Sequence, residues 1–296
     1  LGDFYASCLD EAAIETRGLS GLSPLLGAVD KVKDKKSLLS ALALLHKHGV
    51  FAVWGLATEA DFADSTTNIL YLDTSGLGLP ERDFYVKDEF APARKAYEEH
   101  LTRLFGLLGQ GKASGGLAAD VMALETRLAT LTKTGVERRN PMTMYNPTDL
   151  PGLATQAPGV DWNAYFTALG NAAPGKIAVT TPDFVAGLSA VVAETKPDAW
   201  RAYLTAQVVS ANALALPKAF DDELFKLDQA LSGVESRPER WKRCVKTTSF
   251  ALPEILGQVF VEKHFPGESN APALKLVGAN AAAMNAQIGS LDWMTA

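Results

Sequence analysis

The stretch that decides the fold class is Pro92-Ala-Arg-Lys-Ala-Tyr-Glu-Glu-His-Leu-Thr-Arg-Leu-Phe-Gly-Leu-Leu108. Its apolar side chains, Tyr97, Leu101, Leu104, Phe105 and Leu108, recur at i, i+4, i+7, i+8 and i+11. That spacing places them on one face of an α-helix, with charged residues on the opposite face. The stretch therefore predicts an amphipathic helix from Pro92 to Leu108.

The same period recurs along most of the chain and predicts a mostly α protein. It is found at Val121, Leu124, Leu128 and Leu131; at Trp200, Tyr203, Leu204 and Val208; at Leu224, Leu227 and Leu231; and at Leu274, Val277, Met284 and Ile288. A longer face runs from Trp241 to Phe260, where Pro253 predicts a kink or a helix restart because it lacks a backbone donor. Thr67–Leu72 and Ile177–Thr181 favour strands, so we expect one or two short β-strands beside the helices.

Composition excludes several classes of function. The chain has 296 residues, 47% of them hydrophobic, and carries 28 basic against 34 acidic residues, for a net charge of −6. Binding to nucleic acid or to an anionic membrane surface requires a basic face, so we expect neither partner. The most apolar stretch, Leu38 to Leu56, is interrupted by His46, Lys47 and His48, which argues against a membrane segment in this chain.

The N-terminal residues bear on whether the chain is a fragment, and the two cysteines on whether it contains a disulfide. Leu1 begins inside a helical pattern formed by Phe4, Tyr5, Leu9 and Ala12, and we expect a processed, cloned or cleaved fragment. Two cysteines, Cys8 and Cys244, stand 236 positions apart. From composition alone, each is better explained as a small buried hydrophobe than as half of a disulfide.

The histidines do not form a zinc site of the helical peptidase type. Such a site needs two histidines four residues apart on one helix, with a glutamate directly after the first. The chain has only His46, His48, His100 and His264, and no glutamate follows any of them. His46 and His48 would point about 200° apart on a helix. We therefore expect no metal ligand here, and His48-Gly49 is better explained as a helix end.

Other catalytic patterns are equally weak, so we predict no catalytic residue in this chain. Gly106–Ala113 fits a phosphate-binding GxxxxGK pattern but has Ala113 in place of the Mg²⁺-binding hydroxyl, which favours a helix C-cap followed by a loop. No serine lies in a G-x-S-x-G turn, and nothing around Cys8 predicts a lowered thiol pKa. Asp221-Asp222-Glu223 stand where a helix starts, which favours capping.

Two loops are rich in charge and aromatic residues, namely Gly76–Tyr85 and Glu137–Pro147. Arg82, Arg138 and Arg139 in these loops could face a substrate. The alternative, which we favour, is that they hold the loops in place through bidentate pairs with carboxylates. The substrate-binding residues remain unknown at this level.

Six motifs in order along the chain resemble the neprilysin / endothelin-converting-enzyme family of zinc metallopeptidases. They are Asp3–Glu11, with its YxxC helix; GLGLPERDFY at Gly76–Tyr85; VERRNP at Val136–Pro141; Trp241–Val245; Gly257–Lys263; and LDWM at Leu291–Met294. The chain departs from the family pattern at Glu81, Phe84, Asn140 and Pro253. Each motif alone is weak, but their common order over the chain is specific.

The resemblance implies a lobe without its own active site. In the family, two mostly helical lobes enclose a chamber, and a cap lobe limits entry to peptides. Residues 1–235 are expected to form that helical cap lobe, and residues 236–296 the interlobe helices leading to a catalytic lobe absent from this chain. The HExxH ligands of the family would lie beyond Ala296, so zinc is expected in the parent zinc metalloendopeptidase and none bound by this chain, which alone should be inactive.

The resemblance also implies partners, a crosslink and a location. Cys8 and Cys244 match cysteines that family members outside the cytoplasm join in a disulfide, and such a bond indicates an extracytoplasmic location: periplasmic, cell-envelope or secreted. Expected partners are peptide substrates and either the missing catalytic half or a homodimer, since Pro272–Ser290 presents apolar residues that need cover. The alternative is a stand-alone, non-catalytic helical module that binds peptides or a protein.

Overall fold

The computed structural model describes residues 1–170, 174–265 and 267–292. It divides the chain into two compact units: a major unit, Glu11–Arg237, and a minor unit formed by Leu1–Asp10 with Pro238–Ala296. The sequence-based boundary, between residues 235 and 236, lies close to this division, but the first ten residues belong with the C-terminal segment. Trp293 and Met294 of the LDWM motif and Pro266 lie outside the described residues.

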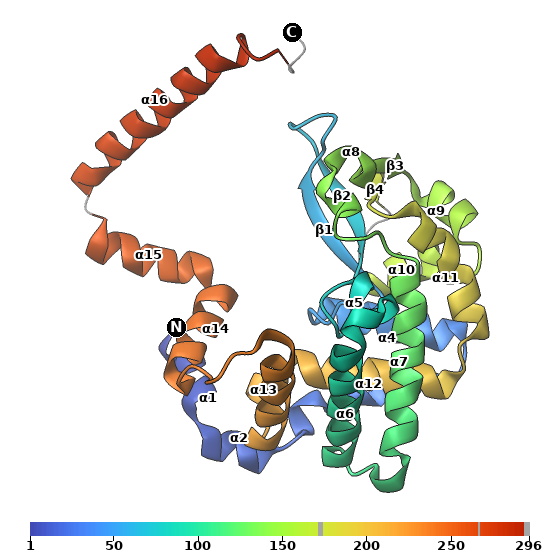
Figure 1. The fold of residues 1–296 in the computed structure, drawn as a ribbon. Coiled ribbons are helices and arrows are strands. Elements are labelled where there is room, and N and C mark those ends of the chain that lie inside the picture. Colours follow the sequence, from blue (N-terminus) through green and yellow to red (C-terminus); the bar gives the residue numbers. More distant parts are fainter. Residues whose placement is uncertain (171–173, 266, 293–296) are drawn as a thin grey trace. The chain divides into compact units, whose positions relative to one another are not determined.

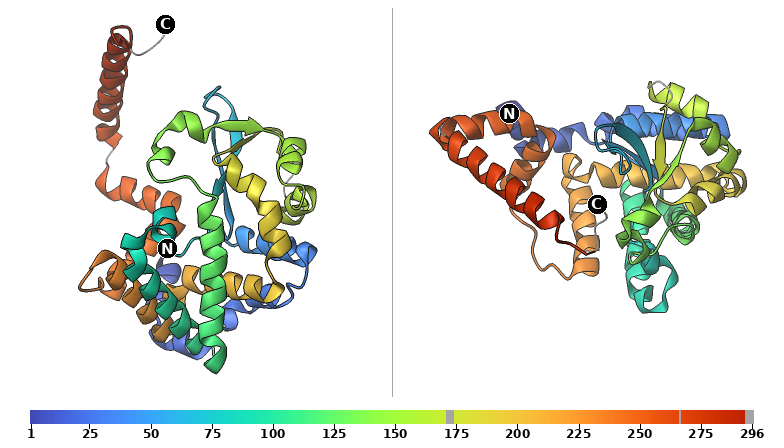
Figure 2. Two further views of the ribbon diagram at one scale, coloured as in Figure 1. Left: turned by 45° about the vertical axis from the view of Figure 1, so that its right-hand side comes forward. Right: turned by 90° about the horizontal axis from the view of Figure 1, so that it is seen from above.

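Helices dominate the major unit (Figures 1 and 2), as expected from the sequence. They are α2 (Glu11–Arg17), α3 (Ser23–Asp30), α4 (Lys35–Lys47), α5 (Arg82–Val86), α6 (Ala91–Leu107), α7 (Ser114–Thr130), α8 (Pro141–Met144), α9 (Leu150–Gln156), α10 (Trp162–Leu169), α11 (Pro182–Glu194), α12 (Pro197–Ala211) and α13 (Lys218–Ser232). The helix expected from Pro92 to Leu108 is α6. It buries Tyr97, Leu101, Leu104 and Phe105, the face that the spacing indicates.

A small sheet lies among these helices, with strand order β1-β2-β4-β3. The strands are β1 (Trp54–Ala60), β2 (Asn68–Thr74), β3 (Asn146–Thr148) and β4 (Ile177–Val179). β1 and β2 form an antiparallel hairpin, β2 pairs with β4 in parallel, and β3 pairs with β4 antiparallel. Only β2 and β4 were expected. β1 contains glycine and alanine and β3 contains proline, residues with weak strand propensity, so their pairing is set by tertiary contacts.

A cluster of aromatic side chains packs in the core of the major unit, next to the start of β1. The Trp54 ring at the start of β1 lies 5.2 Å from both Trp162 and Tyr165 of α10. His46 of α4 contacts the same cluster, with Nδ1 2.5 Å from the Tyr165 hydroxyl and Nε2 2.9 Å from the Ala52 carbonyl. Burial lowers the pKa of His46 to about 4, so this histidine is a neutral core residue.

Helix ends follow the turn residues of the sequence. His48 caps α4, its Nδ1 2.9 Å from the Leu44 carbonyl, and Gly49 follows with φ +75°, as expected for His48-Gly49. Gly109, with φ +78°, ends α6, so the GxxxxGK stretch is a helix terminus as expected. Asp221 lies in the first turn of α13, as expected for a helix start, but the expected capping by Asp221-Asp222-Glu223 is wrong, because α13 begins at Lys218 and its N-cap residue is Pro217.

The three acidic residues instead make lateral ion pairs. Arg237 bridges Asp221, at 2.8 Å, and Asp222, at 2.6 Å. Glu223 is buried and accepts from Arg103 Nε at 2.8 Å beside His100 Nδ1 at 3.2 Å. The Glu223 contacts fasten α13 to α6, whereas the Arg237 pairs hold the segment that follows α13 against that helix.

The minor unit consists of α1 (Gly2–Leu9), α14 (Arg240–Ala251), α15 (Pro253–His264) and α16 (Asn270–Ile288). The expected restart at Pro253 is present, since α14 ends at Ala251 and α15 begins at the proline. The single helix expected at the N-terminus is instead two, α1 and α2. Asp10 separates them with φ −77° and ψ 76°, outside the helical region, as suits a residue that is disfavoured in helix interiors.

A disulfide joins the first and last parts of the chain within the minor unit. Cys8 of α1 and Cys244 of α14 are bonded in the structure, with Cα atoms 5.7 Å apart, inside the range that the bond requires. Arg240 Nε donates to the Cys8 carbonyl at 2.8 Å. This is the pair that the family resemblance implies.

Loss of this crosslink should destabilise the chain. A loop of 236 residues gives a chain-entropy contribution of roughly 5 kcal/mol as an upper figure. Reductant should lower the midpoint of denaturant unfolding of the wild type and leave a Cys8→Ala/Cys244→Ala variant unchanged. Alkylation of two thiols per chain in the denatured, unreduced protein would contradict the bond.

Candidate functional site

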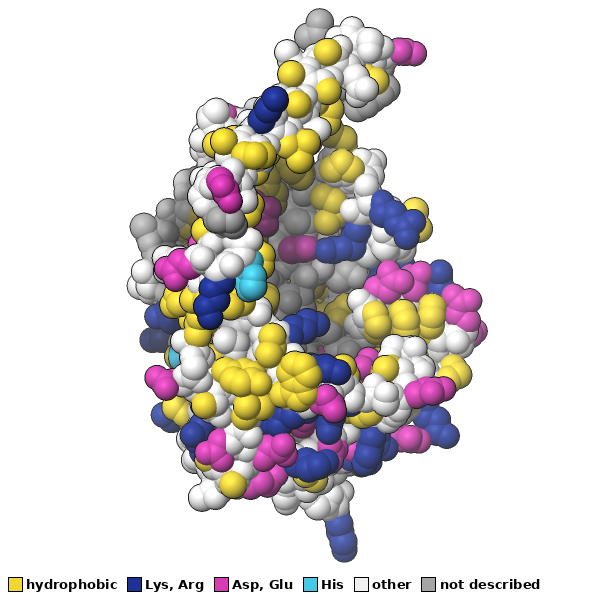
Figure 3. Space-filling view, turned by 90° about the vertical axis from the view of Figure 1, so that its left-hand side faces the viewer, with side chains coloured by type: hydrophobic (Ala, Val, Ile, Leu, Met, Phe, Trp, Pro, Cys, Tyr) yellow, Lys and Arg dark blue, Asp and Glu magenta, His cyan; other side chains and the backbone are white. Residues whose placement is uncertain are grey.

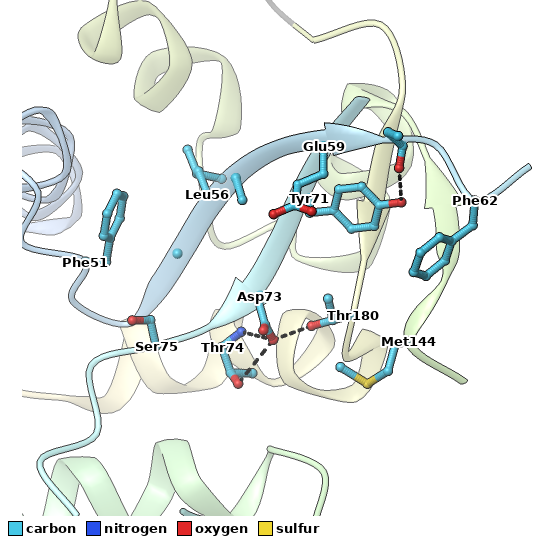
Figure 4. A pocket seen from close by; sticks show the side chains of 13 residues that line it. Phe51, Leu56, Glu59, Phe62, Tyr71, Asp73, Thr74, Ser75, Met144 and Thr180 are labelled. Atoms are coloured by element: carbon cyan, nitrogen blue, oxygen red, sulfur yellow. Dashed lines mark hydrogen bonds between the residues drawn. The ribbon is translucent and has the colours of Figure 1, made fainter. Parts of the chain in front are cut away.

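Two adjoining cavities in the major unit form the candidate site. The first, which we call the hairpin pocket, has a volume of about 430 Å³ and lies on one face of the β1–β2 hairpin (Figure 4). The second, which we call the loop pocket, has a volume of about 280 Å³ and lies beside the GLGLPERDFY motif. Thr74 and Ser75, at the end of β2, line both cavities, so the two are neighbours.

The pairing of the hairpin explains the shape of the hairpin pocket. Gly55 faces Asp73 and Ala57 faces Tyr71 across the two strands, so these four residues share one face of the hairpin. Gly55 and Ala57 of β1 have small side chains, so they leave a hollow over this face of the hairpin, and larger side chains line the hollow. The larger lining residues are Phe51, Leu56, Glu59, Phe62, Tyr71 and Met144 (Figure 4).

Aromatic rings at the rim are open to solvent. Phe62 is 64% exposed although its ring lies 5.9 Å from Tyr71 and 5.7 Å from Tyr145. The Tyr71 hydroxyl donates to the Ala60 carbonyl at 3.0 Å, which fixes the phenol along β1 (Figure 4). An exposed aromatic rim around an apolar hollow is typical of a binding surface.

The floor of the hairpin pocket is polar and internally paired. Arg138 donates to Asp73 from both terminal nitrogens, at 2.7 and 3.1 Å, and the Thr180 hydroxyl donates to the same carboxylate. Burial acts to raise the pKa of Asp73, but the bonds from Arg138 and Thr180 outweigh it, and the net pKa is lowered. Arg138 therefore holds its loop against β2, the alternative favoured from the sequence, while Arg139 is exposed.

The loop pocket has a cationic wall. Arg82, Lys133 and Arg138 line it together with Glu81. Lys133 is committed to the fold, because its ammonium donates to the carbonyls of Thr143 and Thr180. Arg82 of the GLGLPERDFY motif also lines this pocket, and its guanidinium lies 4.0 Å from the Asp83 carboxylate, which is the long limit for an ion pair.

A single buried carboxylate, Glu125 of α7, organises the loop between these cavities. Its Oε2 accepts from the Gly78 amide at 3.0 Å and the Tyr85 hydroxyl at 2.6 Å. Its Oε1 accepts from the Tyr97 hydroxyl at 3.0 Å and from Gln207 Nε2 at 3.2 Å. Burial raises the pKa of Glu125 to about 7, against the effect of these donors.

The glycines of the motif are required by close approach. Gly76 has φ +74°, and a Cβ there would lie 2.2 Å from the Tyr203 hydroxyl. A Cβ on Gly78 would lie 1.8 Å from the Tyr97 hydroxyl. The Tyr203 hydroxyl donates to the Gly76 carbonyl at 2.8 Å and accepts from the Val53 amide at 2.9 Å. Val53 itself has φ 67°, a strained value for a β-branched residue, which these surroundings maintain.

The described residues do not fit a zinc site. Among residues 1–170, 174–265 and 267–292, no group of three or more His, Cys, Asp or Glu side chains is placed to hold a metal ion. His46 and His100 are buried against Tyr165 and Glu223, whereas His264 is exposed on α15. No histidine or cysteine lines either pocket in the part of the chain described here.

Sequence reasoning singled out the GLGLPERDFY loop, Arg82 and Arg138, but missed Glu125, Tyr203 and the whole β1 side of the hairpin pocket. A glutamate on the apolar face of a predicted helix is a detectable signal, since burial of an unpaired carboxylate is costly. No described helix is both long enough and apolar enough to cross a membrane.

Comparison with known proteins places these features in a family. A family model described as Peptidase family M13 matches residues 1–296. The chain is 27% identical over 315 residues to an endothelin-converting enzyme homolog of Locusta migratoria, covering 99% of this chain and 43% of that protein. It is 26% identical over 315 residues to neprilysin-3 of Drosophila melanogaster, covering 98% and 40%. The chain thus spans less than half the length of these relatives.

Solved structures give the same result. The cryo-electron microscopy structure of the Mycobacterium tuberculosis zinc metalloprotease ZMP1 in its open state matches with a TM-score of 0.89 and 32% identity, covering 99% of this chain and 46% of that one. A PepO structure from Lactobacillus rhamnosis matches with a TM-score of 0.80 at 16% identity, which bears on the fold alone. The resemblance and the mostly α fold expected from the sequence are both confirmed.

Adding one methyl group at Gly78 should destabilise the fold. A Gly78→Ala variant must displace buried Tyr97 from Glu125, at a cost of roughly 1–3 kcal/mol in the free energy of unfolding. Gly116→Ala is the matched control, because Gly116 lies in α7 with open space around it and alanine should stabilise the helix by about 0.5–1 kcal/mol. Equal unfolding midpoints for the two variants would refute this packing.

The buried carboxylate should give a distinct pH dependence. The pKa of Glu125 is raised from 4.5 to about 7 in the folded state, so the fold binds this proton more tightly than the unfolded chain does. Its contribution is complete below pH 4.5 and is lost as the pH rises through about 7, by an amount on the order of 3 kcal/mol.

Urea unfolding of the wild type and of Glu125→Gln across this range measures the difference. The pKa values of His46 and His100 are lowered and act in the opposite sense, but they are common to both proteins. The gap in unfolding free energy between wild type and variant should therefore shrink as the pH rises from 4.5 to 7. A gap that does not change with pH would show that Glu125 does not titrate in this range.

Proposed function

The chain belongs to peptidase family M13, the neprilysin family of metallopeptidases, and we propose that it is the helical cap lobe of a zinc metalloendopeptidase. The observation that carries this proposal is the match of the family over residues 1–296. The relatives of similar sequence include an endothelin-converting enzyme homolog and neprilysin-3, and this chain covers 43% and 40% of their lengths. The remaining length of such a protein would supply the catalytic lobe.

The surface of the minor unit supports a partner lobe. The helix α16 has no buried residue, and Leu274, Leu276, Val277 and Met284 are each more than 60% exposed. Exposed hydrophobic side chains are also visible on the face drawn in Figure 3. Apolar surface of this kind is stable only when covered. We infer that it packs against the catalytic half of the protein or, in the chain alone, against a second copy.

The cap role rests on what the major unit contains. It supplies a closed helical core, the hairpin pocket and the loop pocket, but its described residues supply no zinc ligand set. Such a lobe can enclose a chamber and restrict entry to peptides, while zinc and its bound water are held elsewhere in the parent protein. When bound there, zinc would activate water for attack on a peptide carbonyl.

The location that suits this function is extracytoplasmic. One disulfide, Cys8–Cys244, uses both cysteines of the chain, and such bonds persist in oxidising compartments. A stand-alone binding module, the other hypothesis from the sequence, is not favoured, because 99% of this chain matches part of a longer protein in each comparison.

The activity test needs the full-length protein and the 296-residue chain side by side. We expect the full-length protein to cleave unstructured peptides with loss of activity in chelator and recovery with Zn²⁺, and to leave folded proteins intact. The 296-residue chain should neither cleave peptides nor retain zinc on dialysis. Peptide cleavage that survives chelation, or one zinc held tightly per 296-residue chain, would contradict the proposal.

A further inference from the structure

We propose that the free edge of β1 docks an extended peptide segment, with one apolar or aromatic side chain in the hairpin pocket and a lysine or arginine next to Glu59. The inference rests on the proposed function only in taking peptides as the substrate class. The groups that would hold the peptide are the backbones of Leu56 and Thr58 together with the pocket beside them.

Hydrogen bonding across the hairpin fixes which way the backbone of β1 points. The Ser75 amide donates to the Val53 carbonyl at 3.0 Å, and the Asp61 amide donates to the Thr67 carbonyl at 2.8 Å. Alternate residues of an antiparallel strand bond to the same neighbour, so the odd-numbered residues of β1 face β2. The N–H and C=O groups of Leu56 and Thr58 therefore point away from the sheet.

These outward groups have room for a partner. β1 is the terminal strand of the sheet, and Ala57–Ala60 are exposed. The Ala60 carbonyl is already used by the Tyr71 hydroxyl. Within the described residues, no hydrogen bond to the backbone of Leu56 or Thr58 is present outside the hairpin. Two residues at alternate positions offer the ladder that one extended strand can complete.

The two edge strands of the sheet, β1 and β3, differ in length and in proline content. β3, at the opposite edge, has three residues and carries Pro147, which cannot donate to a further strand. β1 has seven residues and carries no proline, no lysine and no arginine. An exposed edge strand that lacks proline and basic side chains can pair with a further strand. The contrast within one sheet favours a binding role for the β1 edge.

The hairpin pocket lies directly beside that edge. Leu56, Ala57 and Glu59 of β1 line it, and Phe62 and Phe51 are 64% and 39% exposed at its border. Its volume of about 430 Å³ accommodates a large apolar side chain from a strand paired with β1. Backbone pairing and a side-chain pocket together are the two parts of peptide recognition by strand addition.

Charge favours a basic peptide over a second copy of this chain. Asp73 at the pocket floor is paired with Arg138, whereas Glu59 is exposed and no lysine or arginine lines the hairpin pocket among the described residues. A cation next to the bound apolar residue would pair with Glu59. The β1 strand of a second copy carries no lysine or arginine and would therefore offer Glu59 no cation.

The test uses the full-length protein stripped of metal with chelator, so that peptides bind without cleavage. The probe is a fluorescein-labelled peptide of alternating threonine and phenylalanine flanked by lysines, measured by fluorescence anisotropy. Thr58→Pro removes the outward N–H and should weaken binding by roughly tenfold or more, whereas Thr58→Ala keeps the N–H and should stay within about twofold. The same peptide with glutamates for lysines should bind more weakly, and Glu59→Lys should reverse that preference.

Two controls keep the result interpretable. The unfolding midpoints of Thr58→Pro and Thr58→Ala are compared, and a probe N-methylated at alternate residues tests the wild type for the same lost hydrogen bonds. The proposal would be overturned if the wild type did not bind the lysine-flanked probe. It would also be overturned if Thr58→Pro bound this probe as tightly as Thr58→Ala does and the wild type bound the N-methylated probe as tightly as the unmethylated one. Self-association abolished by Thr58→Pro would assign the edge to a second copy and would overturn it as well.

Restoring Zn²⁺ separates this inference from the proposed function. If peptides are cleaved but the KM of the lysine-flanked probe is the same in Thr58→Pro and Thr58→Ala, the docking edge is wrong and the peptidase stands. If no peptide is cleaved while the anisotropy difference between the variants persists, the peptidase assignment fails and the docking edge stands.

Discussion

The burial of one carboxylate, Glu125, is the constraint on which the candidate site depends. A carboxyl group inside a helical core is costly unless donors surround it, and four donors do so here. One of them, the Gly78 amide, belongs to the GLGLPERDFY loop. The loop therefore cannot move away without leaving the carboxylate with one donor fewer, and its conformation depends on Glu125 of α7 as well as on its own glycines.

The same loop also helps to fix the position of the β1–β2 hairpin. Tyr203 holds the Gly76 carbonyl and the Val53 amide with one hydroxyl, so the end of β2 and the start of β1 share an anchor on α12. The strained φ of Val53 directs the chain into β1. The helices thus fix both ends of the hairpin while its outer strand stays open, which is the combination a binding edge requires.

Much of this architecture could be predicted from the sequence, but not the contacts that position the site. Helical periods specified α6, α7 and α12 because each buries a continuous apolar face. β1 escaped prediction because Gly55 and Ala57 carry little strand propensity, although their small side chains leave room for the hairpin pocket. The position of Glu125 on the apolar face of α7 is visible in the sequence, but its partners, from Gly78 to Gln207, converge only in the folded chain. The family motifs located the loop without showing what holds it.

Hydrogen exchange of the amides that bond only to side chains tests this account most directly. The Gly78 amide bonds to Glu125, the Leu79 amide to Tyr85 and the Val53 amide to Tyr203. If the buried carboxylate organises the loop, these amides should exchange as slowly as the core of α7, because they open only when that core opens. Exchange as fast as at the exposed hairpin tip near Ser65 would show that the loop moves independently, and would contradict the central role of Glu125.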